Sequence, residues 1–283
     1  MYDPTTTVKD DRGQHVSSRR ALRAKRWTSE PWITRIGLSV LPWFVLIGLW
    51  YALRYSGLVK PALVPTPTDV FATFWRLLTQ KGLAYDAFVS SARVVAGLAA
   101  GIALAVPVGF MLGWYRSLGR FLDPLVNFFR ALPPIALIPL VIVYFGIGET
   151  AKIVILFYAA FFSGVIVMYE GIAQISPLYV RVARTLGATD AEIFQRVIVP
   201  LSLPHVLTAL RVALGVTWAT LVAAELVAAQ RGLGAVIQNA SNYFQISTIY
   251  AGIACIGIIA LGMDTILRAL SSRMVSWQDR ITR

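Results

Sequence analysis

Long apolar stretches alternate with shorter polar stretches along this chain. Six segments are apolar enough, and at about 20 residues long enough, to cross the hydrocarbon core of a membrane as helices. They are residues 36–53, 88–114, 125–146, 151–169, 205–229 and 249–269. None shows the alternation of apolar and polar positions that is typical of membrane β-barrels. The pattern therefore predicts an all-α polytopic membrane protein with six transmembrane helices.

The composition supports this prediction. Hydrophobic residues make up 57% of the 283 residues and the mean hydropathy is +0.66, which is high for a soluble domain. One cysteine and two histidines are too few soft ligands for a zinc centre, so we predict no metal site. The sequence also lacks a glycine-rich phosphate loop, a nucleophile elbow and a carboxylate pair placed for acid–base work. We therefore expect no catalytic residue and no bound cofactor in this chain.

The net charge of +12 could indicate a nucleic-acid partner, but the distribution of the charges favours a membrane topology. Seventeen Lys and Arg residues lie in the two termini and the second and fourth loops, whereas six lie in the other loops. Basic residues concentrate on the cytoplasmic side of membrane proteins. We therefore expect both termini to be cytoplasmic and expect no nucleic acid as partner.

Four regions follow from these patterns. They are a basic cytoplasmic tail with an interfacial entry (1–35), a first transmembrane helix with its outer loop (36–87), a core of five transmembrane helices (88–270) and a cytoplasmic C-terminal tail (271–283).

A polar stretch, residues 177–204, interrupts the apolar half of the core. Ser176 and Pro177 are typical of a helix start, and Gly187 is typical of a helix end that needs a left-handed residue. Thr189 and Glu192 have the spacing of a capping box that opens a second helix, which we expect Pro200 to close. The charge distribution places this two-helix loop in the cytoplasm.

Two further features of the core indicate a pathway or a packing constraint. Pro133 and Pro134 are adjacent in the third apolar segment and should break its helix, which occurs in many transporters but also for packing alone. Glu225 lies in the fifth segment, where a buried carboxylate needs a partner. That partner could be a substrate, a neighbouring helix or the backbone near Gly232. Asp264, one turn from Arg268, is expected to form a local ion pair.

Together these features resemble the membrane-spanning subunit of a binding-protein-dependent ABC importer. The polar stretch resembles the EAA-type cytoplasmic loop of that family, with Ala183, Gly187 and Pro200 at the matching positions. Arg181 and Val182 depart from the family pattern, which has an acidic and a small residue there. Residues 131–153 and 215–234 resemble the subfamily that imports taurine, other sulfonates, nitrate, bicarbonate and related anions, with the taurine and alkanesulfonate permeases most similar.

The resemblance implies a type I ABC importer permease fold in the bacterial inner membrane. It implies a homodimer that works with two cytoplasmic ABC ATPase subunits, which hold ATP and Mg, and with an extracytoplasmic substrate-binding protein. The loop residues expected to couple to the ATPase are Arg181, Ala183, Arg184, Thr185, Leu186, Gly187, Ala188, Thr189, Glu192 and Pro200. The residues expected along the substrate path are Pro133, Pro134, Thr217, Trp218, Thr220 and Glu225.

Taurine or another sulfonate is the expected cargo, and nitrate, bicarbonate or another small anion or carboxylate is the alternative. A secondary transporter driven by ions would need inverted repeats and intramembrane ion sites, and the six-segment pattern with one strong membrane carboxylate argues against it. An integral membrane enzyme would need clustered catalytic residues, which the sequence does not offer.

Overall fold

The structure is a computed structural model that describes residues 32–60 and 62–275. Its residues fall into two compact units, which divide between Pro67 and Thr68. The predicted basic tail lies almost entirely outside the described residues. In the first unit α2 (Trp32–Tyr55) contains the first predicted apolar segment. Trp50 on this helix donates a hydrogen bond to the carbonyl oxygen of Pro65, 3.1 Å away.

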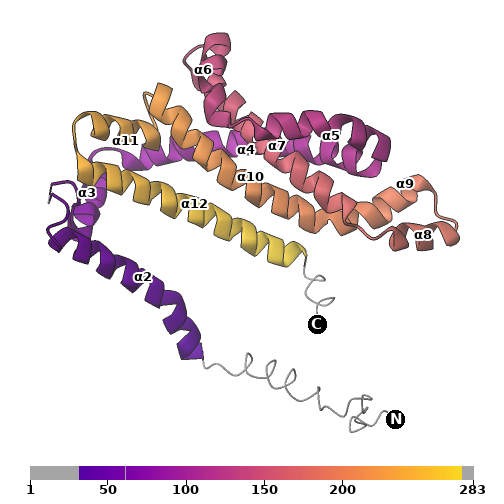
Figure 1. The fold of residues 1–283 in the computed structure, drawn as a ribbon, viewed down its shortest axis with the longest axis horizontal. Coiled ribbons are helices and arrows are strands. Elements are labelled where there is room, and N and C mark those ends of the chain that lie inside the picture. Colours follow the sequence, from indigo (N-terminus) through magenta and orange to yellow (C-terminus); the bar gives the residue numbers. More distant parts are fainter. Residues whose placement is uncertain (1–31, 61, 276–283) are drawn as a thin grey trace, which may run out of the picture. The chain divides into compact units, whose positions relative to one another are not determined.

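The second unit contains the other helices, and no strand occurs among the described residues (Figure 1). The helices are α3 (Pro67–Gln80), α4 (Leu83–Trp114), α5 (Arg116–Ala131), α6 (Pro134–Phe145), α7 (Glu149–Ala173), α8 (Pro177–Thr185), α9 (Asp190–Ile193), the π-helical turn η1 (Phe194–Ile198), α10 (Val199–Ala228), α11 (Leu233–Asn242) and α12 (Ile246–Met274). The predicted all-α class is confirmed.

Four helical segments are long and apolar enough to cross a membrane. They are α4, α7, α12 and the continuous segment Asp190–Val227, which contains α10. The pair α5 and α6 adds a fifth candidate if it is counted as one broken span, and α2 contributes the shorter apolar stretch Val40–Tyr55. Each of the six predicted apolar segments therefore lies mainly in helical structure.

The third apolar segment does not cross as one helix. α5 and α6 meet at an angle of 89°, with Leu132 and Pro133 in extended conformation between them. Proline disfavours the helical conformation in the residue before it, so Pro133 and Pro134 push Leu132 and Pro133 in turn out of the helix. The predicted break is confirmed. The apolar segment 125–146 covers the end of α5 and all of α6, while α5 itself begins earlier, at Arg116.

α4 and α7 pack unusually closely because glycines on α4 face α7. Gly97, Gly101 and Gly109 lie on one face of α4. A Cβ atom added at these positions would lie 2.4 Å from Leu156 Cβ, 2.5 Å from Ala160 Cβ and 2.4 Å from Met168 Cβ, respectively. Small residues let helix backbones approach each other in membrane proteins. This glycine stripe therefore fixes the α4–α7 pair, which is the centre of the second unit.

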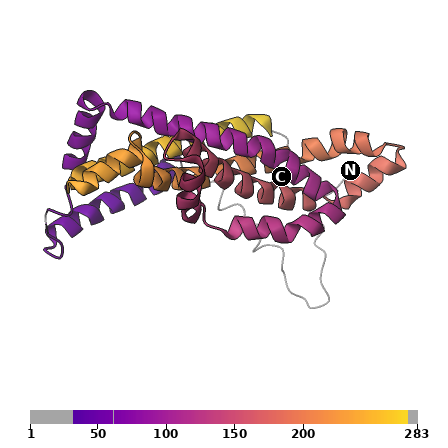
Figure 2. The same ribbon diagram turned by 90° about the horizontal axis from the view of Figure 1, so that it is seen from above.

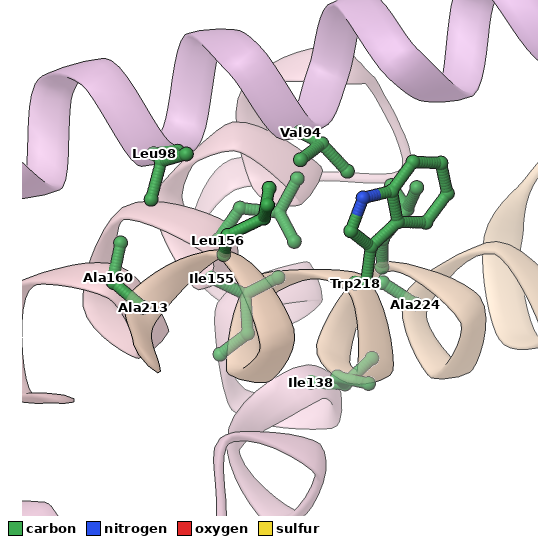
Figure 3. Close-up of a cluster of buried hydrophobic side chains, with 11 residues drawn as sticks. Val94, Leu98, Ile138, Ile155, Leu156, Ala160, Ala213, Trp218 and Ala224 are labelled. Carbon is green, nitrogen blue, oxygen red and sulfur yellow. The ribbon is translucent and has the colours of Figure 1, made fainter. Parts of the chain in front are cut away.

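α10 completes the core by packing on both members of this pair. Figure 3 shows Trp218 of α10 pointing toward Val94 of α4, and further along the same cluster Ala160 of α7 lies beside Ala213 of α10, with Leu156 of α7 between the two places. All five side chains are buried. This contact packs one face of α10, which carries most of the predicted path residues, against both helices of the pair.

Candidate functional site

The polar loop 177–204 begins as its sequence predicts. The Ser176 hydroxyl accepts a hydrogen bond from the Leu178 amide, 3.3 Å away, and Pro177 occupies the first turn of α8. Gly187 follows the end of α8 with a φ angle of +83°, the left-handed region that favours glycine. The predicted start and end of the first loop helix are confirmed.

The predicted capping box at the start of α9 is also confirmed. The Thr189 hydroxyl accepts from the Glu192 amide at 3.3 Å, and a Glu192 carboxylate oxygen accepts from the Thr189 amide at 3.0 Å. Arg184 at the end of α8 pairs with Asp190 at 2.9 Å, and both side chains are exposed. The capping box starts α9, and the Arg184–Asp190 pair spans the Gly187 turn and links the two loop helices.

The prediction that Pro200 closes the second loop helix is wrong. α9 continues through η1 into α10, so one helical segment runs from Asp190 to Val227 over 38 residues. Pro200 lies near the start of α10, directly after η1, where the backbone changes from π-helical to α-helical pairing. A proline has no amide donor and its ring crowds the carbonyl one turn before it, and a π-helical turn is a known way to interrupt the regular helix ladder without ending the helix. The second loop helix is therefore continuous with the fifth span.

α8 exposes an apolar face that the predicted set of coupling residues largely missed. Its members are Leu178, Tyr179, Val182 and Leu186, and all four are exposed. Their spacing of one, three and four residues places them on one side of the helix. Only Leu186 was among the predicted coupling residues. The amphipathic spacing in the sequence could have identified the other three.

The six predicted path residues do not gather around one open cavity. Thr217, Trp218, Thr220 and Glu225 are buried between helices of the same chain. Two hydroxyls are bonded within α10, from Thr217 to the Ala213 carbonyl oxygen at 2.7 Å and from Thr220 to the Val216 carbonyl oxygen at 2.8 Å.

Trp218 and the two prolines differ from these two threonines. Trp218 Nε1 is buried and has no hydrogen-bond acceptor among the described residues. Pro133 is exposed and Pro134 is half-buried, and both lie at the break between α5 and α6.

Glu225 has partners of its own chain on all sides. Its carboxylate accepts hydrogen bonds from the Arg93 guanidinium at 2.6 Å, from the Ser90 hydroxyl at 2.8 Å and from the Gly234 amide at 2.8 Å. Its side chain is completely buried. The carboxylate thus has the partners that a buried charge requires, and in this conformation it offers no free face to a ligand.

Arg93 is the centre of this polar cluster, and sequence reasoning did not assign it a role. Besides Glu225, it binds both carboxylate oxygens of Glu149 at 2.6 Å and the Arg231 carbonyl oxygen at 2.7 Å. Lys152 also binds Glu149, at 2.9 Å. The cluster joins one end of α4, α7 and α10 to the turn before α11. The sequence feature that could have identified Arg93 is its positive charge inside the apolar segment 88–114, opposite in sign to the Glu225 carboxylate in another apolar segment.

A second ion-pair cluster lies further along α10. Asp264 binds Arg268 one turn away at 2.6 Å, so the predicted local ion pair is confirmed. It also binds Arg211 of α10 at 3.0 Å, which links α10 to α12. Within residues 32–60 and 62–275, no three His, Cys, Asp or Glu side chains come together in an arrangement that could hold a metal ion.

Comparisons with known proteins agree with this architecture. The family described as binding-protein-dependent transport system inner membrane component matches residues 94–276. A probable ABC transporter permease protein of Brucella abortus (strain 2308) is 46% identical over 248 residues, which cover 88% of this chain and 98% of the relative. The taurine transport system permease protein of Escherichia coli (strain K12) is 35% identical over 262 residues, covering 90% and 94%.

A solved structure shares the fold. A chain of the MetNI methionine ABC transporter, in an inward-facing conformation, superposes with a TM-score of 0.60 over 68% of this chain and 96% of the other. The two sequences are 23% identical, so this similarity supports the fold alone.

Proposed function

Since the chain belongs to the family of binding-protein-dependent transport system inner membrane components, we propose that it is the permease of an ATP-driven importer of a small anion. Its fold is that of a type I ABC importer permease. In this proposal the chain forms the passage through the inner membrane. ATP and Mg are held by a partner ATPase, and catalysis belongs to that partner.

The observation that carries the proposal is the form of loop 177–204. α8 lies at an end of the bundle (Figure 1). Its exposed apolar face consists of Leu178, Tyr179, Val182 and Leu186. An exposed apolar helix face of this kind fits a groove on a partner protein. Beyond the Gly187 turn, the second half of the loop passes into α10 without a break. A movement of the docked loop would therefore reach the core of the permease directly.

The proposed cargo is taurine or another sulfonate, with nitrate, bicarbonate or another small anion as the alternative. The support is the relative named for taurine transport, which matches nearly the whole chain. Pro133 and Pro134, at the break between α5 and α6, remain the proposed path residues that are accessible. We propose that the other four path residues support the lining of the path without contacting the cargo, since they are buried in this conformation. They are Thr217, Trp218, Thr220 and Glu225.

The proposed assembly contains two copies of this chain, two ATPase subunits on the cytoplasmic side and a substrate-binding protein on the other side. α6 supports the homodimer because Val143, Tyr144 and Ile135 are apolar and well exposed on it. A second copy or lipid can cover such a face. Both termini lie in the cytoplasm in this arrangement, as the distribution of basic residues predicts.

The test is reconstitution of the chain in liposomes with its cognate ATPase and binding protein. We expect uptake of taurine or another sulfonate that requires both ATP and the binding protein. Uptake that persists without any ATPase would contradict the proposal and favour an ion-driven carrier. A panel of sulfonates, nitrate and bicarbonate, tested as competitors, identifies the cargo.

A further inference from the structure

A groove with an arginine rim lies between α8 and the adjoining ends of α4, α5 and α7, and we call it the arginine groove. Its volume is about 760 Å³, within the range of small-molecule sites. The rim carries Arg116 and Arg120 of α5 and Arg181 and Arg184 of α8. In Figure 2 α8 lies beyond the end of α5 that begins at Arg116, as the lining residues require.

The charge of this groove is strongly unbalanced. Asp190 is the carboxylate among its lining residues, and it already binds Arg184 at 2.9 Å. Arg116, Arg120 and Arg181 thus give the rim an excess of positive charge. Side chains of like charge repel each other across a shared groove, and an anion bound between them would relieve this repulsion. The electrostatics therefore favour an anionic occupant.

The floor of the groove is apolar. Among the lining residues, Leu112, Ile172 and Ile198 are buried and Trp114 and Tyr169 are partly buried, so these side chains lie beneath the exposed arginines. A free inorganic anion would gain nothing from this floor, whereas an anionic phospholipid matches both parts, with its phosphate at the arginines and its glycerol and acyl carbons on the floor. Trp and Tyr are also the residues enriched at the membrane interface. The chemistry of rim and floor together fits a lipid.

The position of the groove on α8 leaves it free for such an occupant. Arg181 and Arg184 face the groove, while Val182 and Leu186 belong to the exposed apolar face. The helix can therefore dock a protein on one side and hold a ligand on the other. The loop departs from the family pattern at Arg181, and lining the groove explains why an arginine is suited to this position.

We propose that the arginine groove binds the headgroup of an anionic phospholipid and thereby fixes α8 against the membrane surface. Basic pockets between membrane helices on the cytoplasmic side are suited to anionic headgroups. The assignment to the cytoplasmic leaflet rests on the proposed orientation of the chain, but the binding of the lipid does not. The proposal is independent of which anion is transported.

The test uses the full-length chain purified in neutral detergent and supplied with phosphatidylglycerol. Retained lipid is counted by native mass spectrometry, and the midpoint of thermal unfolding is recorded with each lipid. We expect phosphatidylglycerol to bind and to raise the midpoint, and phosphatidylcholine to do neither. The double variant Arg116→Gln/Arg120→Gln should bind phosphatidylglycerol about twenty-five-fold more weakly, since each arginine near an anionic headgroup contributes roughly a fivefold gain.

Arg196→Gln is the matched control, because Arg196 is an exposed arginine of the same loop that does not line the groove. Its lipid binding should equal that of the unchanged chain. Equal binding of phosphatidylcholine, or unchanged binding by the double variant, would overturn the proposal. Binding of glycerol phosphate as tight as that of the lipid would assign the groove to a soluble anion. If the double variant kept its lipid binding but no longer co-purified with the ATPase, the arginine groove would be assigned to ATPase binding.

Discussion

Arg93 is the residue on which one end of the second unit depends. Its guanidinium holds Glu149, Glu225 and the Arg231 carbonyl oxygen, and its side chain is 5% exposed. Removal of one partner from a buried ion pair leaves an uncompensated charge. We expect Arg93→Ala to destabilise the protein by about 3–5 kcal/mol, measured as a fall in the thermal unfolding midpoint of the purified chain.

Arg196→Ala is the control for this measurement. Arg196 forms an exposed pair with Glu192 at 3.8 Å, and such pairs contribute roughly 0–1 kcal/mol. Arg196→Ala should therefore leave the unfolding midpoint nearly unchanged. If Arg93→Ala also unfolded at the same temperature as the unchanged protein, the polar cluster would not be the structural support that we describe.

Glu225→Gln distinguishes the structural role of Glu225 from a role in binding the cargo. Glutamine keeps the shape of the side chain but removes the negative charge that Arg93 faces at 2.6 Å. We expect a lower yield of folded protein and a lower unfolding midpoint, with an unchanged KM for uptake in the protein that does fold. Normal yield together with a clearly changed KM would show instead that Glu225 contacts the cargo.

The polar cluster also shows where sequence reasoning ends. A carboxylate in an apolar segment predicts that a partner exists, because burial of a lone charge is too costly. The identity of that partner depends on which helices pack together, and Arg93 lies 132 positions away in the chain. Nothing local in the sequence specifies that pairing.

At the scale of elements, the α4–α7 pair depends on the absence of side chains. A Cβ atom at Gly101 would lie 2.5 Å from Ala160 Cβ and 2.9 Å from the Phe161 backbone nitrogen, which cannot move cheaply. We expect Gly101→Ala to destabilise the protein by about 1–3 kcal/mol, measured by thermal unfolding.

Gly257→Ala on α12 is the matched control, because a Cβ atom there would have no neighbour within 4 Å. It should be neutral or slightly stabilising, since alanine favours helix by up to about 1 kcal/mol over glycine. If Gly257→Ala lowered the stability as much as Gly101→Ala, the close approach of α4 and α7 would not be the cause of the destabilisation by Gly101→Ala.

The elements of loop 177–204 divide into those that local sequence could predict and those that it could not. Ser176, Gly187 and Thr189 act through bonds or backbone angles within a few residues, and their roles were predictable. Pro200 was not, because its effect depends on the π-helical turn before it. Tertiary packing holds that turn, since Phe194 lies edge-on to Phe110 and Trp114 of α4 at 5.5 and 5.8 Å between ring centroids.

For the whole molecule, the orientation in the membrane is the prediction with the widest consequences. Leu186 and Ile147 are well exposed, in loop 177–204 and in the turn before α7. With the buried Cys255 replaced by serine, single cysteines at these two positions should react with an impermeant thiol reagent from opposite sides. In inverted membrane vesicles we expect labelling at position 186 and none at 147. The reverse pattern would place the loop outside.

The central claim concerns the whole assembly: loop 177–204 converts ATP hydrolysis by a partner into movement of the permease. Gly187 tests it most directly, because two features of this residue shape the turn between α8 and α9. Its φ angle is +83°, and its amide donates a hydrogen bond to the Arg184 carbonyl oxygen, 3.0 Å away. Proline fixes φ near about −65° and has no amide hydrogen, so Gly187→Pro should deform the turn. Asparagine tolerates the left-handed region, so Gly187→Asn is the matched control.

The decisive measurement is the ratio of anion taken up to ATP hydrolysed in liposomes that contain the complete transporter. We predict that Gly187→Asn keeps the ratio of the unchanged protein. Gly187→Pro should either hydrolyse ATP with little uptake or fail to bind the ATPase, while remaining folded in the membrane. Normal uptake per ATP by Gly187→Pro would contradict the claim that this loop couples the two processes.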